Sequence, residues 1–279
     1  MKELLANPVL IKEIKLRFRN MKSFTGLFFY LMVMGIFVFG FINLTSSVTG
    51  GGFFRPAESF MLFSMLSYIQ LGLILFITPG LTAGTISSER EKQTLNILLT
   101  TAQSSFQIIF GKLLSSIAFL LLLVVSGLPI YSMVFLYGGV APSQIAVIFL
   151  FYFLTLLVIG SLGVMYSTLT RRTITSMIVT YGTTIFLTAV TGFFLILTVT
   201  LSGAAMGSGI SPLSYFWASI NPAVVLLTLL EPGFNDEISL ATGIPLPLWV
   251  SYSIFYILIF IAAMWLSVSR LRVNMNKYR

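Results

Sequence analysis

Long uncharged stretches alternate with short charged clusters along the whole chain. The uncharged runs cover residues 23–54, 59–88, 93–111, 113–170, 173–230 and 238–269. A helix needs about 20 apolar residues to cross a hydrocarbon core of about 30 Å. Most of these runs reach that length, so the pattern predicts an all-α integral membrane protein.

The run 113–170 is too long for one helix, and a Gly/Pro turn between Tyr137 and Ser143 divides it into two. The six predicted spans cover about residues 24–44, 60–83, 113–136, 143–169, 174–201 and 248–269. Pro79 and Pro129 are expected to kink their helices. Nearly half of the residues in the run 93–111 are polar, so this run is not counted as a transmembrane span. The apolar stretch within 211–230 would be a seventh span.

Basic residues decide between six and seven spans. With six, 15 of the 16 bases lie on the face that holds both termini, and Arg55 lies on the other. Cytoplasmic segments carry an excess of Lys and Arg, so we predict cytoplasmic N- and C-termini. The net charge of +8 then divides into +11 inside and −3 outside, because each face holds four of the eight acids. The charge therefore indicates topology and not a nucleic-acid partner.

The composition excludes several classes of function. Of the 279 residues, 9% are charged, and there is no His or Cys, which removes the commonest ligands of zinc, copper, haem and iron–sulfur centres. No Asp, Glu, Lys, Arg or His lies inside a predicted span, so the relay groups of a proton-coupled transporter are missing. An intramembrane enzyme would depend on a few carboxylates at the membrane faces. These are Glu89, Glu91, Glu231, Asp236 and Glu237. We expect no enzyme activity and no metal site.

The segment 7–22 is predicted to be an amphipathic helix that lies on the membrane surface. Asn7 is a suitable N-cap, and Pro8 is tolerated in the first helical turn. Apolar and basic side chains occupy neighbouring faces of this helix. The candidate interfacial residues are Ile11, Lys12, Ile14, Lys15, Phe18 and Arg19. The alternative is a solvated basic leader that only fixes the topology.

The cytoplasmic segment 84–111, between spans two and three, carries a second amphipathic pattern. Ser87 or Ser88 followed by Glu91 resembles a capping box. Three leucines (Leu95, Leu98 and Leu99) then form one apolar stripe. Such a helix suits docking into a groove of a soluble partner. It would equally suit an amphipathic loop that rests on its own transmembrane bundle, and the residues alone leave both alternatives open.

The same segment resembles the coupling region of ABC type-2 permeases, which are six-span exporter subunits. The matching positions are Glu89-Arg90-Glu91, Thr94-Leu95, Leu98-Leu99 and Gly111-Lys112. The start Asn7-Pro8-Val9-Leu10 is similar to the family's N-terminal elbow helix. The order of elbow, two spans, coupling loop, three spans, outer segment and last span also matches. Ala102-Gln103 departs from the pattern, because the family often has a proline there.

The resemblance implies a permease subunit of an ATP-driven exporter in the bacterial plasma (inner) membrane. Its implied partners are two cytoplasmic ABC ATPase subunits, a second permease subunit (a copy or a sister chain) and membrane lipids. ATP and Mg would bind to the ATPase subunits and this chain would hold no cofactor, since it has no P-loop: Leu113 follows Gly111-Lys112. The implied ATPase-coupling residues are Glu89, Arg90, Glu91, Thr94, Leu95, Leu98 and Leu99. The alternative is a non-transporting membrane anchor or sensor that recruits an ATPase.

The resemblance also implies that spans two and five face the dimer partner and flank the pathway. The candidate polar residues on these spans are Ser67, Gln70, Thr180, Thr184 and Thr188. Such residues more often serve close packing between helices. The extracytoplasmic segment 202–247 would form short re-entrant helices that act as an outer gate, with Asn221 and Pro222 at the start of one of them. A flexible outer loop is the alternative.

Overall fold

The computed structural model describes residues 11, 13–15, 18, 19, 21–49, 56–95, 103–137, 140–206 and 212–276. These residues are mostly helical and include no strand. Six helices are long and apolar enough to cross a membrane: Phe24–Thr45, Pro56–Glu91, Ser105–Ser132, Pro142–Leu169, Thr173–Leu201 and Leu248–Leu271. The prediction of an all-α, six-span membrane protein is therefore confirmed, while the sidedness of the termini stays a prediction.

The order of the helices follows the predicted layout. Spans one and two are α3 (Met21–Thr49) and α4 (Pro56–Thr82), and the short helix α5 (Ser87–Glu91) follows α4. Span three consists of α7 (Ser105–Ser126) and α8 (Leu128–Tyr137), which meet at Gly127, and span four is α9 (Pro142–Leu169). Span five consists of α10 (Thr173–Ile185), the π-helical turn η1 (Phe186–Val190) and α11 (Thr191–Met206). Helices α12 (Pro212–Ile220), α13 (Pro222–Leu230) and α14 (Gly233–Thr242) precede the last span, α15 (Leu248–Asn276).

The third span begins earlier than the apolar pattern indicates. Ser104 Oγ accepts the backbone N–H of Gln107, and the Gln107 side chain accepts the Ser104 N–H, which completes a capping box. This cap stabilises a helix start within polar residues that hydropathy assigns to the loop. Helix α7 therefore includes the last residues of the segment 84–111.

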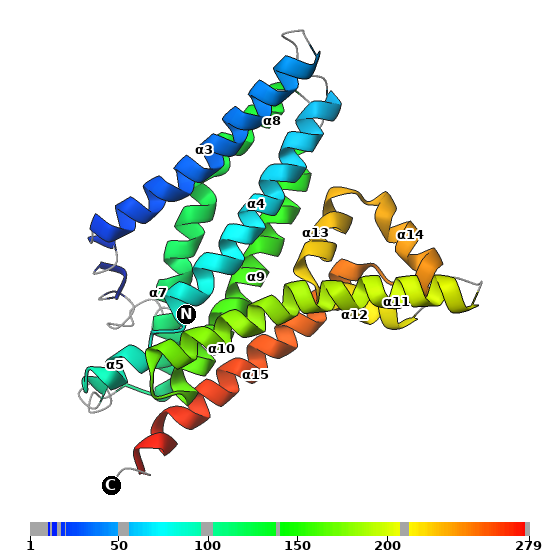
Figure 1. Ribbon diagram of the computed structural model, residues 1–279. Helices are drawn as coiled ribbons and strands as arrows, with labels where there is room; N and C mark the ends of the chain where they lie inside the picture. Colours follow the sequence, from blue (N-terminus) through cyan, green and yellow to red (C-terminus); the bar gives the residue numbers. More distant parts are fainter. Residues whose placement is uncertain are drawn as a thin grey trace.

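Helix α9 forms the centre of the bundle and packs against α4, α7, α10, α13 and α15. Of the residues in its apolar window, 61% are buried, against 17% in span five. Gly163 allows α4 to cross α9 very closely, since a Cβ there would lie 2.1 Å from Thr82 Oγ1. Span five thus lies at the periphery of the bundle (Figure 1).

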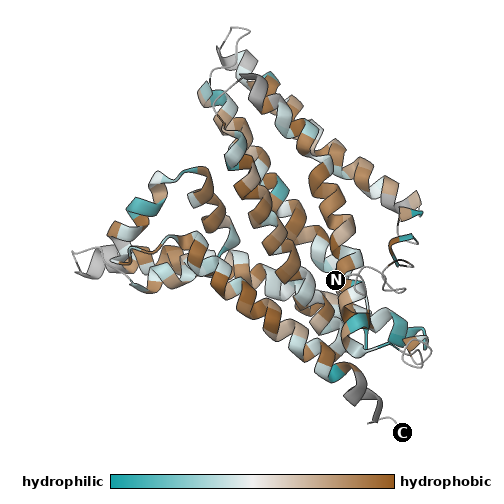
Figure 2. Ribbon diagram, turned by 180° about the vertical axis from the view of Figure 1, so that it is seen from behind, coloured by the Kyte–Doolittle hydropathy of each residue, from teal (hydrophilic) through white to brown (hydrophobic). Residues whose placement is uncertain are grey.

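The ends of the helices gather at separate sides of the molecule. The beginning of α3, helix α5 and the end of α15 lie toward the left of Figure 1, whereas the end of α3 and the end of α11 point to the top and the right. Figure 2 shows hydrophobic residues along the long helices and hydrophilic ones around α5. The side that holds α5 is the one that we predict to be cytoplasmic.

The outer segment folds as a sharply bent pair of helices. Helices α12 and α13 are apolar and meet at an angle of 94° on either side of Asn221. A bend of this size matches a re-entrant hairpin better than a straight seventh span. Helix α14, which the sequence pattern did not indicate, follows α13. It ends at Gly243, which adopts the left-handed conformation (φ 71°) that commonly terminates helices at glycine.

Candidate functional site

The N-terminus of α5 is held by a serine of α9. The backbone N–H groups of Ile86 and Ser87 both donate to Ser167 Oγ at 2.9 Å, and that hydroxyl donates to Ser87 Oγ at 3.1 Å. Both serines are fully buried. The predicted capping box is wrong, because α5 has Ile86 at its N-cap position and no side-chain cap. An oxygen from a distant helix supplies the acceptor in its place.

Arg90 and Glu91 bind the connection between α9 and α10. The Arg90 guanidinium donates to Thr170 O at 2.6 Å and to Thr168 O at 3.0 Å. Glu91 Oε1 accepts the backbone N–H of Thr173 at 2.9 Å, and its Oε2 accepts the Thr173 hydroxyl at 2.8 Å. A cation therefore lies at the C-terminus of α9 and an anion at the N-terminus of α10, as the two helix dipoles favour.

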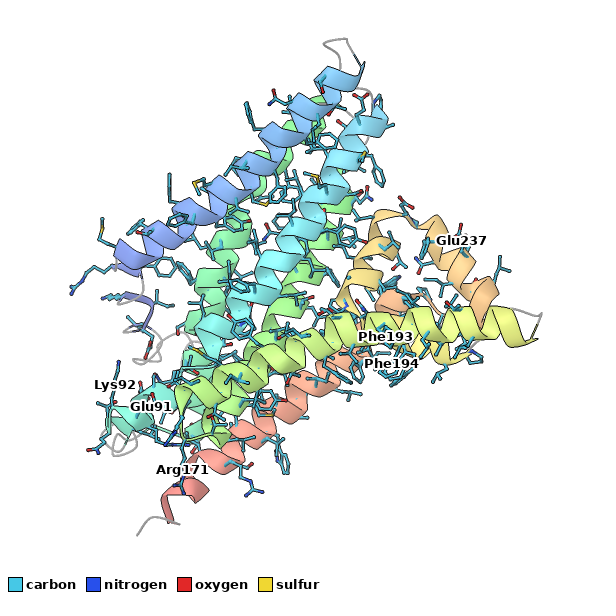
Figure 3. The ribbon with its side chains drawn as sticks, viewed as in Figure 1. Glu91, Lys92, Arg171, Phe193, Phe194 and Glu237 are labelled. Carbon is cyan, nitrogen blue, oxygen red and sulfur yellow. The ribbon has the colours of Figure 1, made fainter. Side chains whose placement is uncertain are left out.

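From the length of span two we place these contacts beyond the hydrocarbon. The continuous apolar element Pro56–Glu91 has 36 residues, and about 20 suffice to cross the membrane, so its charged end extends outside. There the Thr173 backbone N–H, followed by the Thr173 hydroxyl, lowers the pKa of Glu91. Glu91 is thus held ionised where it caps α10. Figure 3 shows Glu91, Lys92 and Arg171 at the same corner of the molecule.

A buried lysine joins α5 to the N-terminal segment. Lys112, on α7, is 4% exposed, and its Nζ lies 2.6 Å from Glu89 Oε1 and 3.1 Å from Glu13 Oε1. A polar cavity of about 310 Å³ lies beside these three side chains and is also lined by Lys92. The arrangement brings two carboxylates to one ammonium group, so the loss of Lys112 would leave both without their cation.

The C-terminus of α5 turns the chain back onto the bundle. Gln93 adopts φ 58°, and the N–H groups of Gln93 and Thr94 donate to Arg90 O and Glu89 O. This is the Schellman pattern, with glutamine in the position where glycine is most common. Leu95 is then 5% exposed and packs in a cluster with Ile86, Ile108, Ile109, Met264 and Leu271.

The described part of the coupling segment therefore rests on its own bundle. Directly after α5 an edge remains exposed, formed by Lys92, Gln93 and Thr94. Leu98 and Leu99 lie outside the described residues. The coupling role of this edge stays a prediction.

The structure describes part of the predicted interfacial helix, residues 11, 13–15, 18, 19, 21 and 22. Ile11, Ile14, Lys15 and Phe18 are helical, and Lys12 lies outside the described residues. Ile11, Lys15 and Arg19 are exposed, whereas Phe18 packs edge-on against Phe119 of α7 at 6.2 Å between ring centroids. One side of the segment thus contacts the bundle, and its place at the membrane surface stays a prediction.

Most of the polar residues predicted for the pathway are buried within the helix bundle of this chain. Ser67, Gln70, Thr180 and Thr184 are at most 5% exposed. The hydroxyls of Thr180 and Thr184 donate to the carbonyl four residues earlier in α10. Gln70 accepts a hydrogen bond from Tyr30, and Ser67 O accepts one from Tyr152. These contacts agree with the packing alternative, and Thr188 is the one half-buried member of the set.

Asn221 and Pro222 begin a short helix, as the sequence predicts. Asn221 Oδ1 accepts the N–H groups of Ala223 at 2.9 Å and Val224 at 3.3 Å, with Pro222 as the first residue of α13. The sequence did not reveal that Asn221 Nδ2 also donates to Thr188 O at 2.7 Å. It likewise did not reveal Ser167 and Thr173 as partners of α5, because no local pattern marks them.

The described residues include no group of three or more acids, histidines or cysteines that could hold a metal ion.

A protein-family model described as "ABC-2 family transporter protein" matches residues 59–269, which is more than half of the chain. The match includes α5, its partners on α9 and α10, and the bent pair α12–α13. No curated protein sequence matches the chain.

Proposed function

Because the chain belongs to the ABC-2 family of transporter proteins, we propose that it is the membrane-spanning permease subunit of an ATP-driven exporter in the bacterial plasma membrane. It dimerises with a second permease chain and works with two cytoplasmic ABC ATPase subunits. Hydrolysis takes place on those subunits, which bind ATP and Mg. The segment 84–111 passes their movement to the spans.

The observation that supports this proposal most directly is the pair of contacts made by Arg90 and Glu91. Through them α5 holds the end of α9 and the beginning of α10. The exposed edge after α5 is adjacent to these contacts in the sequence. A force applied to that edge therefore acts on the start of span five, since hydrogen bonds to charged groups are stronger than those between neutral groups.

Span five is also the span with the smallest buried share, 17% of its window. A helix with a small buried share moves at a smaller cost in lost packing than a central one such as α9. Movement of span five relative to α9 is accordingly the step that we assign to the opening of the pathway.

The proposal is tested on the complex that forms between the tagged chain and the ATPase that co-purifies with it. Wild-type chain in nanodiscs is expected to raise the turnover of that ATPase. Arg90→Ala and Glu91→Gln are expected to retain the ATPase and to lower this stimulation several-fold, because they remove contacts within the permease. Glu237→Gln is the matched control, since Glu237 is an exposed acid on α14, away from α5 (Figure 3).

Unchanged stimulation in both variants, with intact assembly, would contradict the coupling role of α5. An ATPase that binds but never responds to the chain would instead favour the membrane anchor or sensor. Co-purification of no ATPase at all would exclude both.

A further inference from the structure

Span five changes its helical geometry near its own midpoint. The π-helical turn η1 covers Phe186–Val190, and the N–H of Thr191 donates to Phe186 O, five residues earlier. A π-helical turn inside an α-helix contains one extra residue and frequently marks a functional position. The N–H of Thr191 also donates to Thr188 O, three residues earlier.

The side chain of Asn221 binds to this turn. Its Nδ2 donates to Thr188 O at 2.7 Å and to Thr191 Oγ1 at 3.0 Å, while its Oδ1 caps α13. Both amide hydrogens and both lone pairs of Asn221 are thereby used. The residue is 2% exposed. Gly192 makes room for it, since a Cβ there would lie 3.1 Å from Asn221 Nδ2.

Helix α13 is itself fixed to the core of the bundle. Val225, Leu226 and Leu230 are at most 2% exposed and belong to the main hydrophobic cluster. At its end, Gln144 of α9 donates to Leu230 O at 2.9 Å, and before its start Tyr256 of α15 donates to Ile220 O at 3.3 Å. The amide of Asn221 therefore attaches a peripheral span to a fixed helix.

Span five has few other polar attachments of this kind among the described residues. At its beginning Thr173 binds Glu91 of α5, as described above. In between, Tyr181 donates to Phe76 O at 2.9 Å in an exposed bond, and Thr183 Oγ1 donates to the Tyr166 hydroxyl of α9 at 3.1 Å in a partly buried one. The contacts of Asn221 with Thr191 are buried, where a hydrogen bond is stronger and its loss costs more.

From this geometry we infer that Asn221 is the pivot of span five. About 15 residues separate Thr173 from Thr188, and about 15 separate Thr191 from Met206, so each arm is about 22 Å long at 1.5 Å per residue. A displacement at the α5 end is passed through η1 to the outer end of α11, with similar size and opposite direction. Asn221 is thus a positioning residue that converts movement on one side of the membrane into movement on the other. This inference rests on the proposed function, which supplies the movement of α5.

The test measures the two arms separately. Because the chain has no cysteine, spin labels can be placed by cysteine substitution at chosen pairs. The inner pair is Ile174 and Ser269, and the outer pair is Leu201 and Leu240, all four of which are exposed. Double electron–electron resonance is recorded on the complex with its ATPase in nanodiscs, with and without a non-hydrolysable ATP analogue. Labelled chain is diluted with unlabelled chain so that only distances within one chain contribute.

Wild-type chain is expected to show nucleotide-dependent shifts of several ångströms in both pairs. Asn221→Ser keeps an oxygen that can cap α13 but is too short to reach Thr188. In this variant the inner shift persists and the outer shift falls to less than half. Gly192→Ala gives the same result by an independent route, since the added methyl group displaces the amide. Thr200→Val is the matched control on α11, because among the described residues the Thr200 hydroxyl bonds within its own helix, to Ile196 O.

Two results would overturn the inference, and they differ in what else they exclude. If the wild-type inner pair shifts and the outer shift is unchanged in both variants, Asn221 is not the pivot, while the proposed function stands. If neither pair shifts in wild-type chain although the ATPase is bound, the coupling in the proposed function fails, and the pivot fails with it.

Discussion

The crossing of α4 and α9 at Gly163 permits a quantitative prediction. A Cβ at Gly163 would lie 2.1 Å from Thr82 Oγ1, 2.9 Å from Thr82 Cβ and 3.2 Å from the backbone nitrogen of Ala83. Thr82 has no free direction to move, since it is fully buried and its hydroxyl donates to Thr78 O at 2.8 Å. Gly163→Ala therefore has to push the two helices apart.

The expected magnitude follows from two opposing effects. Overpacking a core costs about 1–3 kcal/mol, and the better helix propensity of alanine returns about 1 kcal/mol. The net loss is about 0–2 kcal/mol, which for a chain of this size lowers Tm by as much as about 8 °C. Scanning fluorimetry at one fixed heating rate measures the change. Gly72→Ala is the matched control on α4, since Gly72 has no atom within 4 Å of the added carbon.

A second variant tests the cause of the loss. Thr82→Ala removes the oxygen that the new methyl group meets. The double variant should therefore lose less stability than the two single variants lose in sum, by about 0.5 kcal/mol or more. Ser167, which holds α5, lies one helical turn after Gly163, so Gly163→Ala should also weaken the stimulation of the ATPase. A Tm for Gly163→Ala equal to or above that of Gly72→Ala would refute the close crossing.

Three further predictions concern α5 and its surroundings. Lys112→Met should lower the free energy of unfolding by about 2–3 kcal/mol. Breaking a fully buried ion pair costs about 3–5 kcal/mol, and the loss is smaller here because the carboxylates of Glu13 and Glu89 are 31% and 24% exposed. A Tm within about 2 °C of wild type would contradict this. Gln93→Gly should raise Tm slightly, since glycine adopts the left-handed conformation of that position without strain, and a fall would argue against the observed turn. The lowered pKa of Glu91 means that its contact with Thr173 stabilises the fold above the ordinary glutamate pKa of about 4.3 and is lost as pH falls through the lower, folded-state value. The Tm difference between wild type and Glu91→Gln should therefore be constant from pH 7 to about pH 5 and shrink below that.

Much of the coupling segment was found from the sequence, but not its contacts. The cluster Glu89-Arg90-Glu91 stood out because it interrupts long uncharged runs and resembles the family pattern. Its partners did not, since Arg90 and Thr170 are 80 residues apart and Glu91 and Thr173 are 82 apart. Threonine and serine are also frequent along the spans, so nothing in their local pattern singles out Thr173 or Ser167 from the others.

The sequence by itself determined the number of spans, their approximate positions and the start of α13. A run of about 20 apolar residues, and an Asn-Pro pair that caps a helix, are local properties that need no knowledge of the rest of the chain. Which face of each span is buried was decided only by the tertiary structure. In a soluble helix polar and apolar faces differ, but in a membrane both the lipid and the core accept apolar side chains. The buried face of span five, the role of Lys112 between two carboxylates and the contact of Asn221 with η1 therefore depend on which helices come together.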